Sequence, residues 1–365
     1  MVFDDTRLKA LYSRYGYIQF RMSKFEEYEL YVRNKDFLDS LNVITFTDTN
    51  GKLMALKPDV TLSIVKNSKD TPGEVRKVFY NENVYRVSKR TGSFQELMQV
   101  GLECVGDVDE YNIYEVIMLA AESLMDISEN CVLDISHLGI INDILNSCDV
   151  DYNTRGKILI CISEKNAHGI RRICEENNIP EKKAEILCRL VYIYGRPEDV
   201  IPRLEKLLAG EEAKESIEQL KRIAGAFDGN QLREILRIDF SVTNDIGYYN
   251  DIVFIGFVQG VPDKILSGGQ YDKVMLKMGL KSRAIGFAIN TNALERINAS
   301  DDIYDVDTLL IYENNADIID VKDAVEELTK DGGRVLAQRN IPDKIKYRQL
   351  IKLQNGEVKT IESDD

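Results

Sequence analysis

Four segments in the first third of the chain have the patterns of β-strands, and turns join them in pairs. The first pair, 43–48 and 53–56, flanks Thr49-Asn50-Gly51, and an Asn-Gly step tolerates the positive φ angles of a tight hairpin turn. The second pair, 76–86 and 94–106, encloses a polar loop. Hairpins in succession predict an antiparallel sheet.

Helical periodicity dominates from about 151 to 234, where Pro180 and Pro197 interrupt it, and this stretch predicts an inserted helical bundle. After a helix that begins near Asn292, the tail is predicted to run strand, helix, strand and a final hairpin about Asn355-Gly356. The remaining patterns predict helices at 5–15, 26–33, 114–124 and 140–145 and strands at 16–25, 132–135, 235–242, 252–258 and 284–289.

These elements predict a fold of the α+β class, an antiparallel sheet flanked by helices with a helical insertion and a small C-terminal α/β module. We expect the core to comprise 1–150 and 235–298, the insertion 151–234 and the module 305–365. The chain has 365 residues, enough for two or three domains, and its 44% of hydrophobic residues is ample material for a core.

The net charge of −14 disfavours tRNA or DNA as the main partner, because proteins that grip a phosphate backbone normally gather Lys and Arg on one face. The tail 301–365 is itself acidic, with 16 Asp and Glu against 9 Lys and Arg. No segment approaches the roughly 18–20 apolar residues of a membrane span, and the N-terminus lacks the pattern of a secretory signal. We therefore expect a soluble, cytoplasmic protein without a membrane partner.

The six cysteines are scattered singly through apolar segments, and none belongs to a C-x-x-C pair. Such cysteines are typical of small core residues in a reducing compartment. Only two histidines, His137 and His168, are present to complete a metal site. We expect neither a metal nor any other cofactor.

The strand from Gln99 to Cys104 carries the first candidate site. Side chains alternate along a strand, so Gln99, Gly101 and Glu103 share one face. An amide and a carboxylate with no side chain between them describe the floor of a small polar pocket, in which Gly101 leaves room for a ligand. A solvent-facing polar edge fits the same pattern equally well.

Three other segments carry candidate polar side chains. Asp59 and Thr61 lie two residues apart, although a helix start with Pro58 in its first turn explains them without a ligand. Tyr248-Tyr249 precedes an apolar strand, where most such pairs are packing. Ser267 to Asp272 holds a glycine pair before a helix, without the spacing of a P-loop or a dinucleotide fingerprint. The order of these segments is more informative than any one of them.

That order resembles the histidyl-tRNA synthetase family from about Arg7 to Ile297. The resemblance implies a class II aminoacyl-tRNA synthetase-like fold, an antiparallel sheet flanked by helices. The segments that carry it are Gly16–Arg21 (start of motif 1), Leu56–Thr61 (L-R-P-[DE]-x-T), Arg76–Gly106 (motif 2), Gly247–Asn250 (end of the histidine-specific signature), Ser267–Asp272 (G-G-R-Y-D) and Ala284–Leu294 (motif 3).

The resemblance also implies a histidine pocket. In the family, the ammonium group lies against residues that correspond to Asp59, Thr61 and Gln99, and the imidazole against those that correspond to Glu103 and Tyr249. Carboxylates complement an ammonium through charge-assisted hydrogen bonds, and a carboxylate and a phenol can meet the two ring nitrogens. The full set implied is Asp59, Thr61, Arg86, Gln99, Glu103, Tyr248, Tyr249 and Tyr271.

The positions that the family uses for adenylation differ here. Asn244 stands where the histidine signature has an arginine, and Ala293 where motif 3 has an arginine against the nucleotide phosphates. In motif 2, Ser88 replaces an acid, and Ser93 and Gln95 replace two arginines. Adenylation needs positive charge around the polyphosphate. We therefore expect no catalytic residues and no adenylation.

A histidine pocket kept without that cationic clamp resembles the regulatory subunit of short-form ATP phosphoribosyltransferase. The resemblance implies a non-catalytic role in the first step of histidine biosynthesis, with histidine as effector and a catalytic subunit as partner in a hetero-octamer. It also implies self-association as a dimer through the motif 1 region. Whether histidine binds the pocket or an interface with the catalytic subunit stays open.

Two alternatives remain. A divergent, active histidyl-tRNA synthetase would need another arginine, such as Arg283 or Arg296, in place of Ala293, and an anticodon-binding domain that the short acidic tail does not match. A free-standing histidine-binding protein would control some other partner and would associate with no phosphoribosyltransferase subunit.

Overall fold

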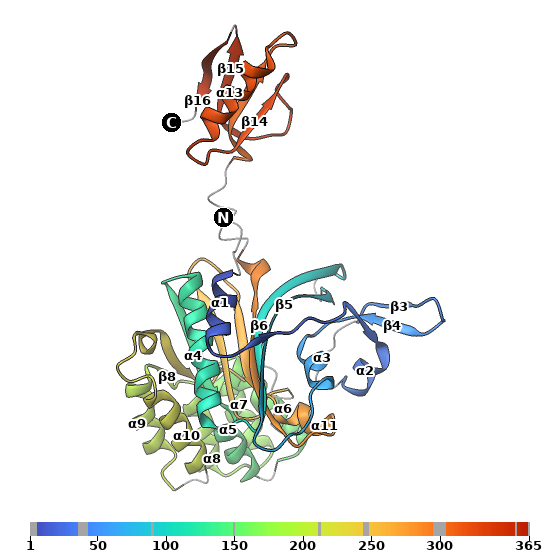
Figure 1. The fold of residues 1–365 in the computed structure, drawn as a ribbon. Helices are drawn as coiled ribbons and strands as arrows, with labels where there is room; N and C mark the ends of the chain where they lie inside the picture. The colour runs from blue at the N-terminus through green and yellow to red at the C-terminus, as the bar shows by residue number, and fades with distance from the viewer. Residues whose placement is uncertain are drawn as a thin grey trace. The chain divides into compact units, whose positions relative to one another are not determined.

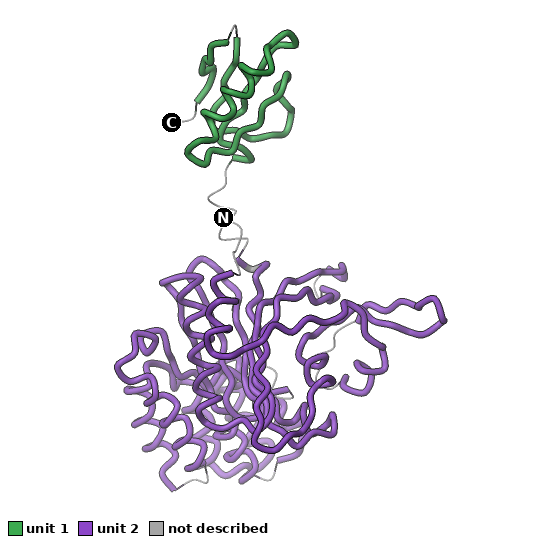
Figure 2. Tube along the Cα trace, in the orientation of Figure 1, with its two compact units in different colours: residues 1–2, 295–365 green, residues 3–294 purple. Residues whose placement is uncertain are grey.

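The computed structural model describes residues 6–35, 43–88, 91–148, 150–210, 213–243, 248–294, 304–354 and 356–363. They fall into two compact units, one within 3–294 and one within 295–365 (Figure 2). None of the helices in these ranges is both long and apolar enough to cross a bilayer. The six cysteines form no disulfide with one another.

A nine-stranded sheet forms the centre of the larger unit (Figure 1). Its strands are β1 (Ile18–Gln19), β5 (Val75–Val87), β6 (Phe94–Gly106), β7 (Cys131–His137), β8 (Tyr194–Gly195), β9 (Leu236–Asp239), β10 (Ile252–Val258), β11 (Leu266–Gln270) and β12 (Arg283–Asn290). They lie in the order β1-β5-β6-β12-β11-β10-β7-β9-β8, and neighbours are antiparallel except in the pairs β1/β5 and β7/β9. The predicted antiparallel sheet is confirmed.

Strand β6 lies inside this sheet, between β5 and β12. It pairs with β5 over the full length of both strands. On its other side, Gly286 of β12 stands opposite Glu103, and Asn290 stands opposite Gln99. Segments nearly 200 residues apart along the chain therefore form one surface around Glu103.

One face of the sheet is covered by α1 (Thr6–Arg14) and α4 (Glu110–Ile127). Leu124 of α4 packs into the space above Gly256, where a Cβ would lie 2.7 Å from its Cδ1 atom. The rings of Tyr12 and Phe287 meet edge to face on this side, 6.1 Å between centroids. Because side chains alternate along β12, the residue before Phe287 faces the opposite side of the sheet.

The described residues between 151 and 234 are mainly helical, as predicted. Pro180 directly precedes α8 and Pro197 is the first residue of α9, positions that suit the constrained φ of proline. Strand β8 pairs with β9 at the sheet edge, which helical periodicity does not predict. Helix α5 (Leu138–Asn146) precedes this stretch, whose helices are α6 (Tyr152–Ser163), α7 (Ala167–Glu176), α8 (Glu181–Leu190), α9 (Pro197–Leu207), α10 (Lys214–Gly225) and the 3-10 helix η1 (Gln231–Ile235).

A second, three-stranded sheet lies beside the first and consists of β2 (Phe25–Glu27), β4 (Leu53–Leu56) and β3 (Thr45–Thr47). Strands β3 and β4 form the hairpin predicted from the Asn-Gly step, and Gly51 has a φ of +79°. The helices α2 (Tyr28–Arg33) and α3 (Thr61–Lys66) accompany this sheet.

The glycine pair at Gly268-Gly269 lies in β11 within the central sheet, a strand that the sequence analysis did not predict. Helix α11 (Asp272–Lys277) does follow it. A Cβ on Gly268 would lie 2.5 Å from the Gly286 carbonyl oxygen, and one on Gly269 would lie 2.7 Å from that of Ile252. Close backbone approach, rather than a turn, therefore explains these glycines.

In its described residues, 304–354 and 356–363, the smaller unit consists of a four-stranded sheet in the order β14-β13-β15-β16 and the helix α13. Its core includes Leu310, Ala324, Ile351 and Leu353. The predicted strand, helix, strand and final hairpin of the tail are all present. The elements are β13 (Val306–Tyr312), α13 (Ile318–Thr329), β14 (Val335–Gln338), β15 (Tyr347–Gln354) and β16 (Glu357–Ser363).

Candidate functional site

Glu103 lies on the face of β6 that points away from α4, and it is only 2% exposed. Its carboxylate accepts a hydrogen bond from Thr61 Oγ1 at 2.7 Å and another from the Tyr271 hydroxyl at 2.6 Å. Three residues that the sequence analysis singled out in separate segments are therefore in direct contact. This face of β6 is not a solvent-exposed polar edge.

Glycines on two strands make this arrangement feasible. A Cβ on Gly286 would overlap Oε2 of Glu103 across the strand pair. Gly101 was predicted to leave room for a ligand, but the structure gives another explanation for a glycine at this position. A Cβ there would lie 2.6 Å from the Tyr80 hydroxyl and would also meet the Phe287 carbonyl oxygen. Tyr80, and not a ligand, takes the space above Gly101.

Burial raises the pKa of the Glu103 carboxyl to about 8, because a buried carboxylate loses its hydration. The hydrogen bonds from Thr61 and Tyr271 oppose this rise, and the nearby Asp59 carboxylate adds to it. No ion pair joins Glu103 to any lysine or arginine in the described ranges. The carboxyl group is therefore mainly protonated at neutral pH.

Asp59 and Arg86 lie beside this group. Asp59 Oδ1 accepts a hydrogen bond from the backbone N–H of Leu62 at 2.8 Å, in the first turn of α3, so the helix-start interpretation also applies. Burial raises the pKa of Asp59, which the Leu62 hydrogen bond and the Arg86 charge lower. Arg86 Nε donates to the Pro58 carbonyl oxygen at 2.9 Å, so its guanidinium lies against the same segment.

Tyrosine rings form the wall of the site next to Glu103. Tyr271 is 1% exposed, and its ring lies 5.8 Å from that of Tyr248 between centroids. Tyr248 in turn meets Tyr249 edge to face at 5.0 Å. Burial raises the pKa of Tyr271 well above its ordinary value, so its hydroxyl stays neutral and donates to Glu103.

Gln99 stands opposite Glu82 of β5 and Asn290 of β12, on the same face as Glu103. Asn244 lies in 244–247, outside the described residues. The side chain of Ala293, the last residue of the 3-10 helix η2 (Thr291–Ala293), lies outside them too. The loss of the two adenylation arginines therefore stays a prediction.

Sequence reasoning missed a buried ion pair in this region. Lys57 is fully buried, and its Nζ lies 2.6 Å from Oε2 of Glu82. The sequence pattern that could have predicted it is the position of Glu82 two residues after Tyr80, which places both side chains on the face of the sheet that carries Glu103. A lone lysine in the segment Leu56-Lys57-Pro58 would then have been its natural partner.

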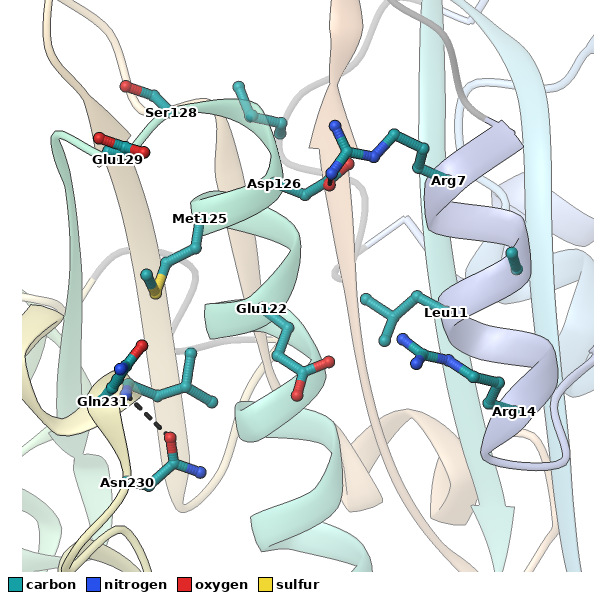
Figure 3. A pocket seen from close by; sticks show the side chains of 13 residues that line it. Arg7, Leu11, Arg14, Glu122, Met125, Asp126, Ser128, Glu129, Asn230 and Gln231 are labelled. Carbon is teal, nitrogen blue, oxygen red and sulfur yellow. Dashed lines mark hydrogen bonds and ion pairs between the residues drawn. The ribbon is translucent and has the colours of Figure 1, made fainter.

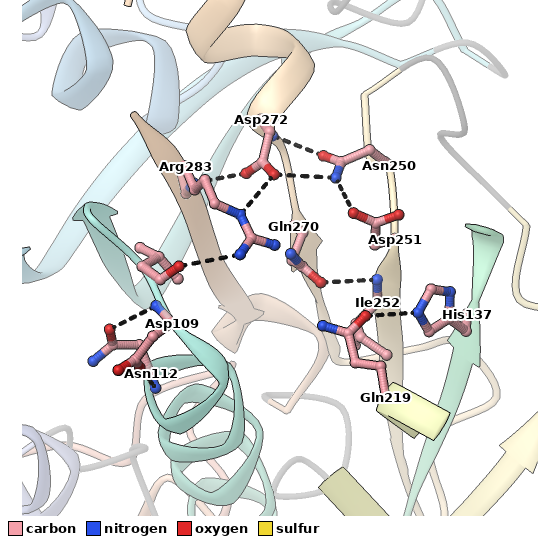
Figure 4. A network of polar contacts seen from close by, with 12 residues as sticks. Asp109, Asn112, His137, Gln219, Asn250, Asp251, Ile252, Gln270, Asp272 and Arg283 are labelled. Atoms are coloured by element: carbon pink, nitrogen blue, oxygen red, sulfur yellow. Dashed lines mark hydrogen bonds and ion pairs between the residues drawn. The ribbon is translucent and has the colours of Figure 1, made fainter. Parts of the chain in front are cut away.

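A polar network holds the chain next to Tyr271 in place (Figure 4). The carboxylate of Asp272 accepts hydrogen bonds from the Ala284 N–H at 2.8 Å and from Arg283 Nε at 3.3 Å. The Asp272 N–H donates to Asn250 Oδ1 at 2.7 Å. These contacts join the start of α11 to β12 and to the residues before β10, and so position the Tyr271 hydroxyl.

The described site thus combines two carboxyl groups, several phenol hydroxyls and one guanidinium. This set suits a ligand that presents cationic groups and hydrogen-bond donors to the carboxyls. Within the described ranges, no group of three or more His, Cys, Asp or Glu side chains is arranged to hold a metal ion.

A separate groove of about 800 Å³ lies between α1, the end of α4 and the start of η1 (Figure 3). Arg7 and Asp126 form an ion pair of 2.7 Å at one end, and Arg14 and Glu122 line it further along. Its helices cover the face of the sheet opposite to Glu103. The groove therefore contains none of the predicted site residues.

Curated relatives align with most of the chain. An ATP phosphoribosyltransferase regulatory subunit of Acetivibrio thermocellus is 27% identical over 318 residues, which cover 84% of this chain and 76% of the relative. Proteins of the same name from Clostridium kluyveri and Clostridium acetobutylicum are 26% and 25% identical, over 89% and 98% of this chain and 85% and 89% of their own lengths.

Solved structures share the fold. An ATP phosphoribosyltransferase regulatory subunit/histidyl-tRNA synthetase from Bacillus halodurans C matches with a TM-score of 0.74 at 21% identity, covering 95% of this chain and 92% of its own. A chain of the ATP phosphoribosyl transferase (HisG:HisZ) complex from Thermotoga maritima matches with a TM-score of 0.62 at 19% identity, covering 80% and 98%. The class II synthetase-like fold predicted from the motifs is confirmed.

The family model described as histidyl-tRNA synthetase matches residues 5–294. This range contains the sheet, the helices that cover it and every residue of the site around Glu103. The chain therefore belongs to the histidyl-tRNA synthetase family.

Proposed function

We propose that this chain is the regulatory subunit of an ATP phosphoribosyltransferase, a non-catalytic partner that associates with the catalytic subunit and responds to free histidine. The observation that carries the proposal is the shared name of the relatives above, which align over 84–98% of this chain. The resemblance places Asn244 and Ala293 where the family has adenylation arginines, and a loss of those arginines would support a non-catalytic role, because charge development on a nucleotide polyphosphate needs such cations.

We propose further that histidine occupies the site around Glu103. Its ring would lie against Glu103 and Tyr249 and its ammonium group against Asp59 and Gln99. Thr61 would lie on the ammonium side with Asp59 and Gln99, and its hydrogen bond to Glu103 links the two sides of the site. The other members of the set are Arg86, Tyr248 and Tyr271.

Histidyl-tRNA synthetase activity is the second candidate, which the family model itself favours. One arginine that would rescue it is Arg283. That residue begins β12 opposite Gly106, seven residues or roughly 23 Å along the strand from Asn290. Its guanidinium contacts Asp272 and the Val108 carbonyl oxygen. These contacts argue against a role in place of Ala293, whereas Arg296 lies outside the described residues.

Reconstitution with a short-form catalytic subunit tests the proposal. We expect the two chains to co-purify, the phosphoribosyl transfer to ATP to accelerate, and added histidine to inhibit it. Light scattering should give a dimer for this chain and a mass of four copies of each subunit for the complex. ATP–pyrophosphate exchange with histidine should stay at background. Strong exchange without any association would instead support a synthetase.

A further inference from the structure

The Glu103 carboxyl stands in an environment that contains hydroxyl groups and another acid but no contacting cation among the described residues. Thr61 and Tyr271 donate to its two oxygens. Gly286 presents only backbone to it. The charged and titratable groups that face it, from the loop before α3, from β5, from the segment before β10 and from the start of α11, are Asp59, Tyr80, Tyr248 and Tyr271. The charge of Arg86 acts in turn on Asp59.

This environment holds a proton on Glu103 before a ligand arrives, since Asp59 repels a second negative charge and burial removes hydration. The same environment favours the carboxylate once a cation is next to it. Two hydroxyl groups already point at its oxygens, and hydrogen bonds to the charged form stabilise that form. The site therefore favours the protonated form of Glu103 when it is empty and the carboxylate when a base is bound.

Imidazole is such a base. Its ordinary pKa of about 6.5 lies close to neutrality, and it can accept a proton at one nitrogen and donate from the other. In contact with Glu103, one ring nitrogen accepts the carboxyl proton, the O–H bond breaks and an N–H bond forms. The products are an imidazolium and a carboxylate, and the Asp59 charge stabilises the new cation. No proton leaves the protein in this step.

We propose that the pocket binds its ligand as an imidazolium, formed with the proton that Glu103 carries beforehand, and that it therefore selects amino acids with a protonatable ring. This inference rests on the proposed function, because it takes histidine to occupy the site around Glu103. It adds which ionisation state the pocket recognises.

Nitrogen NMR of ring-labelled ¹⁵N-histidine bound to the full chain tests the proposal at about pH 8, where free imidazole is neutral. We expect both ring nitrogens to show the imidazolium signature in the complex and the neutral signature with Glu103→Gln. Histidine should bind at least about tenfold more tightly than its 1,2,4-triazole analogue, whose ring is a weaker base, because a charge-assisted hydrogen bond is roughly twice as strong as a neutral one. That preference should shrink in Glu103→Gln.

Circular dichroism and thermal unfolding of Glu103→Gln check that it is folded, and Tyr271→Phe gives a second variant with one donor fewer. We expect Tyr271→Phe to weaken histidine binding more than binding of the triazole. A neutral ring bound to the unmodified chain at about pH 8 would overturn the inference and leave the proposed function intact. Failure of histidine to bind the full chain in calorimetry would overturn both the inference and the assignment of the pocket.

Discussion

Replacement of Gly286 by alanine should disrupt the site through one added methyl group. A Cβ at this position overlaps Oε2 of Glu103, so the carboxyl group has to leave its hydrogen bonds with Thr61 and Tyr271. Two buried hydroxyl groups without a partner cost about 1–3 kcal/mol each. Alanine in a strand regains about 0.5–1 kcal/mol relative to glycine. We expect Gly286→Ala to lower the free energy of unfolding by about 1–5 kcal/mol and to abolish histidine binding.

Urea unfolding followed by circular dichroism measures the first effect, and calorimetric titration with histidine measures the second. Gly156→Ala is the matched control, because Gly156 lies within α6 and a Cβ there meets nothing within 4 Å. This control should gain about 0.5–1 kcal/mol from helix propensity and bind histidine normally. Wild-type stability and affinity in Gly286→Ala would refute the contact between Gly286 and Glu103 as the cause.

Three further predictions concern buried ionisable side chains. Glu103→Ala should weaken histidine binding by about 1–3 kcal/mol in calorimetry, the cost of a polar partner lost in a buried site; unchanged affinity would show that histidine binds elsewhere. Lys57→Met should lower the free energy of unfolding by about 3 kcal/mol, because it leaves Glu82 without its cation, and Lys57→Met with Glu82→Leu should recover much of that loss. Asp134 of β7 is 8% exposed, and burial, reinforced by Asp239, raises its pKa to about 7. When folding raises the pKa of a carboxyl group, the protein loses stability as the pH rises towards that pKa. The free energy of unfolding of Asp134→Asn, relative to that of the wild type, should therefore increase by about 2–3 kcal/mol from about pH 5 to about pH 8 in urea unfolding. An equal difference between the two proteins at both pH values would contradict this.

Local patterns were sufficient to predict most elements of the fold. The Asn-Gly hairpin, the long strands around 76–106 and the helices between 151 and 234 all depend on neighbours in sequence, and hydrophobic periodicity and turn residues reveal such local structure. The strand β11 could not be found in this way, because Gly268 and Gly269 have a poor strand propensity and occur there only to let other backbones approach. The two-residue strand β8 is too short to leave any pattern.

For the site, the alternation along β6 placed Gln99 and Glu103 on one face, and the family resemblance selected their partners. Only the tertiary structure determined the contacts and the protonation of those side chains. The Tyr271 hydroxyl reaches Glu103 across 168 residues of sequence, Tyr80 takes the space above Gly101, and Gly286 leaves room for a carboxyl group. The physical reason is that hydration, contact and therefore the protonation of Glu103 depend on what surrounds it in space, and no local pattern along the chain contains that information.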